Sequence, residues 1–251
     1  MKFFIKKKLN QLLGYFDLQI IKKNQRIVGL SSLDEELIKL TSKYSMTPKI
    51  RIYTLLQSLK YIKNKKIEGD FVECGVWKGG NIILYKKILE EDFKNEGRSI
   101  YAYDTFEGMN TPTINDYDLL NKNSAIKIGN KEKKNSNFWG ICSLEEVKNN
   151  ILYNVKNLDH IKFIKGQVET TLNDKNNIPE KISILRLDTD WYKSTKKELD
   201  VLYNKVVPGG IIIIDDYGHW SGSKKAVDEF FKNQYVWMHY IDYACRLIIK
   251  D

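Results

Sequence analysis

Two apolar runs that end in aspartates decide the fold of this chain. They are Ile184-Leu185-Arg186-Leu187-Asp188-Thr189-Asp190-Trp191-Tyr192 and Ile211-Ile212-Ile213-Ile214-Asp215-Asp216-Tyr217. Such aliphatic runs are typical of strands buried in a parallel sheet, whose carboxyl ends open into the crevice where α/β proteins bind ligands. Two neighbouring strands of this kind would place Asp188, Asp215 and Asp216 at one rim. Three carboxylates there repel one another unless a cation lies among them, so the set favours a hard divalent metal. Any one of the aspartates could equally be a helix N-cap.

The rest of the chain alternates strand-like runs with amphipathic helices. This pattern predicts an α/β fold with a doubly wound, mostly parallel seven-stranded sheet. The strands are expected at 70–74, 99–103, 161–164, 182–187, 210–214, 235–241 and 246–250. The last two are joined so tightly, by 242–245, that they must be antiparallel. A parallel sheet closed by such a hairpin resembles that of class I, Rossmann-like, S-adenosylmethionine-dependent methyltransferases, whereas a dinucleotide-binding domain normally runs parallel throughout.

Residues 49–251 are expected to form one methyltransferase domain, because the length suits a single α/β core and no Pro-, Gly- or Ser-rich linker interrupts it. A helical arm is expected over 1–48. Within it, Ser32 is predicted as a helix N-cap with Glu35 at position N3. Apolar residues at helical spacing beside lysines over 4–16 suit two structures, a membrane-surface helix or an arm packed against protein.

Helices are also expected at 49–62, 81–89 and 224–232. The long polar stretch 110–140 predicts a lid-like insertion that closes over the acceptor, or else a disordered segment. It ends at Ser143-Leu144-Glu145-Glu146, a capping box that begins a further helix.

The composition indicates the cellular compartment in which the protein is expected. The three cysteines show no CxxC spacing, which suits a reducing cytosol and argues against disulfides and structural zinc. The lysine-interrupted start has no apolar signal region, so a cytoplasmic protein without membrane contact is expected.

The net charge is +9, yet only five of the 41 basic residues are Arg, the usual residue for phosphate and base recognition. No nucleic-acid partner is expected, and the Lys surplus is the sole support for the alternative of an RNA methyltransferase.

A glycine-rich turn follows the strand predicted at 70–74. Its sequence, Glu73-Cys74-Gly75-Val76-Trp77-Lys78-Gly79-Gly80-Asn81, has the spacing GxxxGG and not the GxGxxG of the NAD fingerprint. Glycines at this place let the backbone approach a ligand closely. Asp104, at the end of the next strand, is placed to accept hydrogen bonds from a ribose diol, although it could merely cap a turn. Together the two features favour a nucleoside-containing cofactor.

Five blocks resemble the motifs of the macrocin O-methyltransferase family, also called the TylF/MycF type. They are 71–80, 103–109, 166–172, 187–195 and 208–218, and the resemblance runs in order from about Gly69 to Phe231. It implies a Mg²⁺-dependent transfer of a methyl group from S-adenosylmethionine to a sugar hydroxyl. The metal would be held by Asp188, Asp215 and Asp216. The cofactor set implied is Glu73, Gly75, Gly79, Asp104, Thr105, Gln167, Val168 and Asp188. A homo-oligomer is expected.

The chemistry of methyl transfer suggests further candidates. A sugar hydroxyl is a poor nucleophile until it loses its proton, and a metal that binds two adjacent hydroxyls would acidify one of them. Besides Asp188, the candidate catalytic residues are His219, three positions beyond the aspartate pair, and Asp190, with Tyr192 next. A lone histidine near a turn is more often a packing residue. Trp191 and Trp220 could stack on a sugar or belong to the core.

The expected acceptor is a sugar with a vicinal diol, attached to a nucleotide diphosphate and destined for a capsule or similar surface polysaccharide. The alternatives are a glycosylated natural product, an RNA, and a binding module that keeps the fold without catalysis. The intact aspartate set argues against the last of these.

Overall fold

The computed structural model describes residues 27–93, 97–132, 135 and 137–251, together with Leu9 and Leu13. The basic amphipathic segment predicted over 4–16 therefore lies almost wholly outside the described residues. The chain divides into two compact units, Met1–Glu35 and Glu36–Asp251. The division into an arm and a domain at 48/49 stays a prediction. None of the described helices is both long and apolar enough to cross a membrane.

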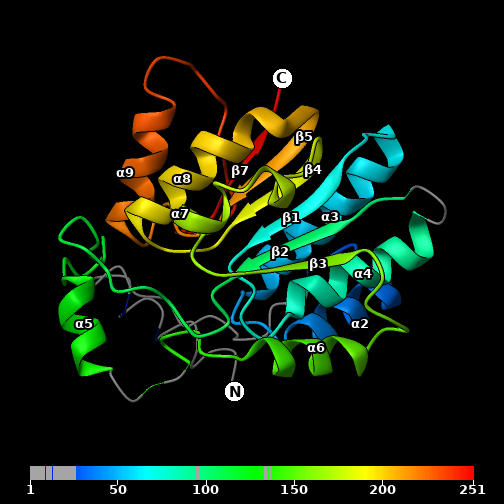
Figure 1. Ribbon diagram of the computed structural model, residues 1–251, viewed down its shortest axis with the longest axis horizontal. Coiled ribbons are helices and arrows are strands. Elements are labelled where there is room, and N and C mark those ends of the chain that lie inside the picture. The colour runs from blue at the N-terminus through cyan, green and yellow to red at the C-terminus, as the bar shows by residue number, and fades with distance from the viewer. Residues whose placement is uncertain (1–8, 10–12, 14–26, 94–96, 133–134, 136) are drawn as a thin grey trace. The chain divides into compact units, whose positions relative to one another are not determined.

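The second unit contains a seven-stranded sheet with the strand order β3-β2-β1-β4-β5-β7-β6. Strands β1 to β5 run parallel to one another, whereas β7 is antiparallel to both β5 and β6. The predicted sheet and its C-terminal hairpin are thus confirmed (Figure 1). The strands are β1 (Asp70–Cys74), β2 (Ile100–Asp104), β3 (Ile161–Lys165), β4 (Ile182–Leu187), β5 (Val206–Ile214), β6 (His239–Tyr240) and β7 (Arg246–Ile249).

The register of the strands positions the site. Cys74 of β1 pairs with Tyr103 of β2 and with Leu187 of β4, and Leu187 pairs with Ile214 of β5. The residues that follow these four strand ends therefore emerge side by side at one edge of the sheet. Strand β4 is buried at every position, which explains why four of its six residues are aliphatic.

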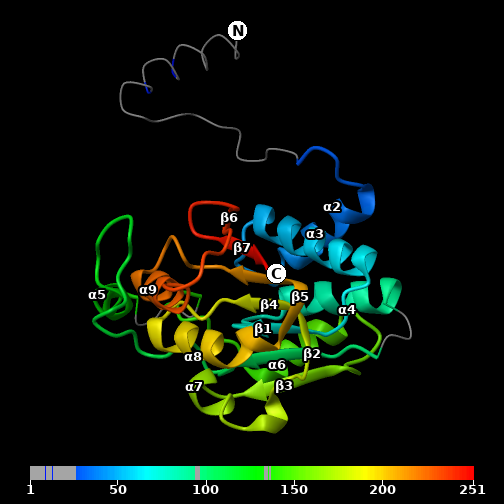
Figure 2. The same ribbon diagram turned by 90° about the horizontal axis from the view of Figure 1, so that it is seen from above.

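Helices cover both faces of the sheet (Figures 1 and 2). One face carries α3 (Lys49–Lys65), α4 (Gly80–Asp92) and α6 (Leu144–Leu152), and the other carries α7 (Val168–Thr171), α8 (Tyr192–Leu202) and α9 (Ser221–Phe230). Two 3₁₀ turns lie at Lys175–Asn177 and Tyr203–Lys205. As predicted, Ser143 caps α6, since its hydroxyl accepts the Glu146 N–H at 3.1 Å. All three cysteines are free and buried.

Several predicted boundaries were wrong, including the following three. Helix α2 (Ser32–Thr41) is capped one residue earlier than expected, by reciprocal hydrogen bonds between Ser31 and Asp34, because this pair also has the three-residue spacing of a capping box. Strand β6 is only two residues long, and the Tyr235 side chain at its predicted start is 95% exposed. Strand β5 begins at Val206, four residues before the predicted start.

The described part of the predicted insertion, 110–132, 135 and 137–140, contains helix α5 (Ala125–Lys131). A strap within it, defined here as 110–124, is fixed to the starts of α8 and α9. Asp116 is 1% exposed and accepts the Tyr192 N–H at 2.9 Å, while the Ser221 hydroxyl accepts the Tyr117 N–H at 2.9 Å. The Trp191 indole donates to the Asn110 carbonyl at 2.9 Å. The strap therefore holds the first residues of both helices beside the sheet edge.

Candidate functional site

The three aspartates predicted as metal ligands come together. Asp188 follows β4, and Asp215 and Asp216 follow β5. One carboxylate oxygen from each lies within 4.8 Å of the others. Asp215 is 4% exposed and Asp216 is 9% exposed, whereas the Asp188 side chain is 27% exposed. The cluster therefore has two buried members and one that opens toward solvent.

Arg186 lies beneath this cluster, and sequence reasoning did not assign it a role. Its side chain is 2% exposed because β4 directs it into the sheet edge. One nitrogen, Nη1, donates to Glu73 Oε1 at 2.6 Å and to Asp188 Oδ2 at 2.8 Å; the other, Nη2, donates to Asp215 Oδ1 at 2.7 Å. A planar guanidinium with several fixed donors is suited to joining three carboxylates in this way. The signal in the sequence was an arginine inside an aliphatic run.

A second arginine, Arg51, approaches the cluster from α3. Its Nη1 donates to Asp215 Oδ2, and its Nε donates to Asp242 Oδ2 at 2.7 Å. Arg51 therefore joins the acidic cluster to the turn between β6 and β7. Sequence reasoning missed this residue because it lies far from the aspartates along the chain. The available signal was an arginine on the apolar face of a helix, next to the buried Ile52.

The donor set fits a divalent cation. Six carboxyl groups of the described residues surround the guanidinium groups of Arg51 and Arg186: those of Glu73, Asp188, Asp190, Asp215, Asp216 and Asp242. Fully ionised, this set would carry more negative charge than the two guanidinium groups balance. Burial, together with the neighbouring carboxylates, raises the pKa of Asp188 and of Asp216. Hard oxygen ligands with excess negative charge are what Mg²⁺ prefers.

The glycine turn meets the end of β4 at very short range. Gly75 has φ +91°, and a Cβ atom on it would lie 2.0 Å from the Asp188 carbonyl oxygen. Only glycine allows this approach. Gly79 has φ +88° and precedes α4, where a Cβ would meet the Val147 side chain of α6 at 3.2 Å. Gly79 therefore allows the turn to pack closely against α6. Its membership of the cofactor set stays a prediction.

Asp104 ties the end of β2 to the same turn. Its Oδ2 accepts the N–H groups of Val76 at 2.7 Å and Trp77 at 3.0 Å, and its Oδ1 accepts the Phe106 N–H at 2.7 Å. The carboxylate thus orders the glycine turn. Carboxylate oxygens have further acceptor capacity, so this arrangement is compatible with the predicted contact to a ribose diol.

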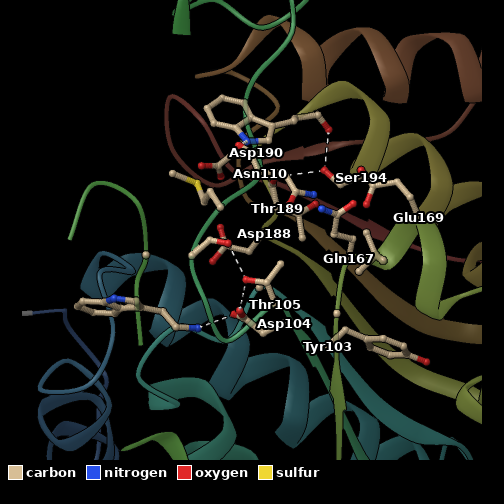
Figure 3. Close-up of a pocket in the computed structure, with 18 of the residues that line it drawn as sticks. Tyr103, Asp104, Thr105, Asn110, Gln167, Glu169, Asp188, Thr189, Asp190 and Ser194 are labelled. Atoms are coloured by element: carbon tan, nitrogen blue, oxygen red, sulfur yellow. Dashed lines mark hydrogen bonds between the residues drawn. The ribbon is translucent and has the colours of Figure 1, made fainter. Parts of the chain in front are cut away.

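A cavity lies between these elements (Figure 3). Six residues of the predicted cofactor set line it: Gly75, Asp104, Thr105, Gln167, Val168 and Asp188. The close-up shows Asp188 and Asp190 at the same cavity as Gln167 and Glu169. Residues that sequence reasoning did not propose also line it, including Met46, Met109, Asn110 and Phe138. We call this space the cofactor-side cavity.

A second cavity adjoins the first, and we call it the acceptor-side cavity. Its walls include Arg51, Glu73, the three clustered aspartates, His219 and Trp220. The two cavities share Gly75, Trp77, Met109, Phe138, Asp188 and Asp190 among other residues. Glu73, a member of the predicted cofactor set, lines this second cavity and is 1% exposed. The carboxylate cluster therefore lies at the junction of the two spaces.

The candidate bases occupy different places. His219 lines the acceptor-side cavity, and burial lowers the pKa of its imidazole, which favours the neutral ring. Asp190 lines both cavities, has φ +67°, and burial raises its pKa to about 7. The Tyr192 hydroxyl instead donates to Glu229 of α9 at 2.7 Å, on an exposed surface. The geometry thus favours His219 and Asp190 over Tyr192.

The two tryptophans of this region are mainly packing residues. Trp191 is 4% exposed and Trp220 is 6% exposed, and their ring centroids are 5.0 Å apart in an edge-to-face pair. Each also contributes to a cavity wall, Trp191 on the cofactor side and Trp220 on the acceptor side.

The strand order, the antiparallel β7 and the cavity at the carboxyl edge of the sheet define a class I methyltransferase fold. The O-methyltransferase NovP has the same fold: the two structures superpose with a TM-score of 0.74 at 24% identity, covering 87% of this chain and 98% of that one. The model of the macrocin-O-methyltransferase (TylF) family matches residues 19–247. The chain belongs to this family.

Two curated relatives extend the comparison. Demethyldecarbamoylnovobiocin O-methyltransferase of Streptomyces niveus is 30% identical over 187 residues, which cover 72% of this chain and 64% of that protein. Mycinamicin III 3''-O-methyltransferase of Micromonospora griseorubida is 27% identical over 184 residues, which cover 70% and 66%. The chain therefore spans a little under two thirds of the length of these relatives.

Proposed function

We propose that this protein transfers the methyl group of S-adenosylmethionine to a hydroxyl of a sugar, with Mg²⁺ held by Asp188, Asp215 and Asp216. One observation carries the proposal: the carboxylate cluster lies where the cofactor-side and acceptor-side cavities meet. Membership of the macrocin-O-methyltransferase family supports the same reaction.

In this proposal, the cofactor-side cavity binds the methyl donor. Asp104 accepts hydrogen bonds from the ribose, Gln167 and Val168 lie by the adenine, and Gly75 lets the backbone approach the donor closely. The sulfonium already activates the methyl carbon, so the protein contributes mainly position and proton transfer. Holding the attacking oxygen against that carbon can supply about 7–11 kcal/mol of barrier lowering in favourable cases.

The acceptor-side cavity orients the sugar. A bound divalent ion would lower the pKa of a coordinated hydroxyl and fix two adjacent oxygens. The hydroxyl oxygen forms its bond to the methyl carbon as the bond from carbon to sulfur breaks, and the hydroxyl proton passes to His219, with Asp190 as the second candidate. Arg186 and Arg51 hold the aspartates in place throughout.

The acceptor we propose is a sugar with a vicinal diol, carried on a nucleotide diphosphate as a precursor of a surface glycan. The net charge of +9 supports an anionic carrier. Among the described residues that line the acceptor-side cavity, Arg51 is the positively charged side chain. It already forms ion pairs with Asp215 and Asp242. A diphosphate would therefore extend beyond this wall. The relatives' names point to the alternative of a glycosylated natural product, and one names a dimethoxy-rhamnosyl compound.

The test is a comparison of three acceptors, with S-adenosylhomocysteine release as the readout and Mg²⁺ present. Thymidine diphosphate rhamnose is compared with methyl rhamnoside and with a deoxy-rhamnoside that lacks one hydroxyl of the diol. We expect the deoxy compound to be inactive and the nucleotide sugar to react faster than the glycoside. Equal rates on all three would remove both the diol and the diphosphate arguments. Activity only on an RNA or a phenol would overturn the substrate class.

A further inference from the structure

The turn between β6 and β7 contacts two residues of the acceptor-side cavity, Arg51 and His219, although no motif marks it. Its Asp242 carboxylate caps the turn, because Oδ1 accepts the N–H groups of Ala244 at 2.9 Å and Cys245 at 2.8 Å. The other oxygen of Asp242 accepts a hydrogen bond from Arg51, which also binds Asp215. The turn is therefore fixed to the carboxylate cluster.

The same turn packs backbone to backbone against the loop that carries His219. The Gly218 N–H donates to the Ala244 carbonyl at 2.9 Å. A Cβ on Gly218 would lie 1.8 Å from the Tyr243 carbonyl oxygen, so a glycine is required for this approach. As a result, Tyr243 and His219 are neighbours through rigid backbone contacts and not through flexible side chains alone.

The side chains of these two residues interact directly. The Tyr243 hydroxyl lies 3.3 Å from His219 Nδ1, and the two rings meet edge to face with centroids 5.8 Å apart. On its other side the imidazole packs against the Trp220 ring at 4.6 Å. Two charged groups, Asp118 and Arg51, act on His219 from the strap and from α3. Within the described part of the chain, Nε2 makes no hydrogen bond.

The tautomer of a neutral histidine is set by the partner of one ring nitrogen. A phenol oxygen can accept a hydrogen bond from Nδ1–H while its own proton points elsewhere. Tyr243 is 47% exposed, so its hydroxyl proton can go to solvent.

We propose that Tyr243 is a positioning residue for His219. It accepts Nδ1–H and thereby fixes the tautomer in which Nε2 is a free hydrogen-bond acceptor for the sugar hydroxyl in the acceptor-side cavity. The inference about the sugar hydroxyl rests on the proposed function, whereas the tautomer itself does not.

The first experiment observes the tautomer without any acceptor. The chain has three histidines, so long-range ¹H–¹⁵N correlation spectra of the full, ¹⁵N-labelled protein can be assigned with the His219→Gln variant. The spectra are recorded at a pH where the ring is neutral. We expect the Nδ1–H form of His219 to predominate in the wild type and the Nε2–H form to predominate in Tyr243→Phe. Tyr235→Phe is the matched control, because Tyr235 is 95% exposed and should leave the tautomer unchanged.

The second experiment measures kinetics with methyl rhamnoside as the probe. Tyr243→Phe should lower kcat by about tenfold or more, because His219 would then present the wrong nitrogen to the hydroxyl proton. The KM for S-adenosylmethionine should stay within twofold of the wild-type value. Unchanged S-adenosylhomocysteine binding shows that the variant is folded.

An Nε2–H tautomer in the wild type, or an unchanged tautomer in Tyr243→Phe, would overturn the proposal. A tautomer that responds as expected in a protein that methylates no sugar would support the positioning role and reject the proposed function. The two failures are therefore distinguishable.

Discussion

Arg186 and Glu73 form a buried ion pair beneath the carboxylate cluster, with Nη1 2.6 Å from Oε1 and neither side chain more than 2% exposed. The same guanidinium holds Asp188 and Asp215, so one side chain from β4 connects β1 with the ends of β4 and β5. Asn81 of α4 also donates to Glu73 Oε1 at 2.9 Å, so this one carboxylate oxygen accepts hydrogen bonds from both side chains. The site is thereby ordered around a fixed positive charge.

Arg186→Met should destabilise the protein strongly. Removing one partner of a buried pair leaves uncompensated charge, which costs about 3–5 kcal/mol. Urea unfolding measures the difference in the free energy of unfolding. The control is Lys181→Met, which removes an exposed ion pair with Glu68 and should change that free energy far less, because water screens the pair. A loss at Arg186 as small as that of the control would show that the guanidinium does not hold the site together.

Asp104→Ala should weaken S-adenosylhomocysteine binding by about 1.5–3 kcal/mol, roughly tenfold to a hundredfold, because it removes charged-acceptor hydrogen bonds. The structure adds a second cause, since the same change releases the N–H groups of Val76 and Trp77 in the glycine turn. Calorimetry measures the affinity. Unchanged affinity, or wild-type binding of NAD in place of S-adenosylhomocysteine, would argue against a methyl-donor site here.

Glu198 makes stability depend on pH. It lies on α8 with no exposed surface, accepts the Thr189 hydroxyl at 2.9 Å, and burial raises its pKa from 4.5 to about 8. The folded state therefore keeps a proton that the unfolded state loses. Between about pH 4.5 and pH 8, this carboxyl lowers the free energy of unfolding by up to about 1.4 kcal/mol per pH unit as the pH rises.

Glu198→Gln should remove this contribution. From about pH 4.5 to pH 8, the free energy of unfolding of this variant should rise relative to that of the wild type, and above pH 8 the difference should level off. Urea unfolding at several pH values measures both. Glu180→Gln, on an exposed side chain, should keep the wild-type dependence. Parallel curves for Glu198→Gln and wild type would mean that the carboxyl is ionised in the folded protein.

The cation site is tested most cleanly at Asp216. Asp215 also binds both arginines, whereas Asp216 forms no ion pair among the described residues. Asp216→Asn should therefore weaken Mn²⁺ binding, followed by electron paramagnetic resonance, at least tenfold while leaving S-adenosylhomocysteine affinity nearly unchanged. Asp200→Asn on the exposed face of α8 is the control. Equal Mn²⁺ binding by both variants would assign the aspartates to other roles.

Much of this arrangement could be predicted from the sequence, because it depends on residues that are close to one another along the chain. Aliphatic runs specify buried parallel strands, and strand ends in register bring Asp188 and Asp215 together without knowledge of any side-chain contact. The glycine turn is equally local, since Gly75 marks a close backbone approach.

The remaining features depend on contacts across the chain. Arg51 reaches Asp215 from a helix that precedes the sheet, and Tyr243 reaches His219 from a turn that follows it. The spacing of apolar residues along the sequence does not indicate such contacts between distant parts of the chain. The start of β6 could not be placed either, because exposed aromatic residues such as Tyr235 have a high strand propensity wherever they lie.

The central claim is metal-dependent methyl transfer at the carboxylate cluster. The most direct measurement is S-adenosylhomocysteine release from thymidine diphosphate rhamnose and methyl rhamnoside, first in EDTA and then after addition of excess Mg²⁺. The arrangement of Asp188, Asp215 and Asp216 predicts no turnover in EDTA and full recovery with Mg²⁺. Full turnover in EDTA would contradict it.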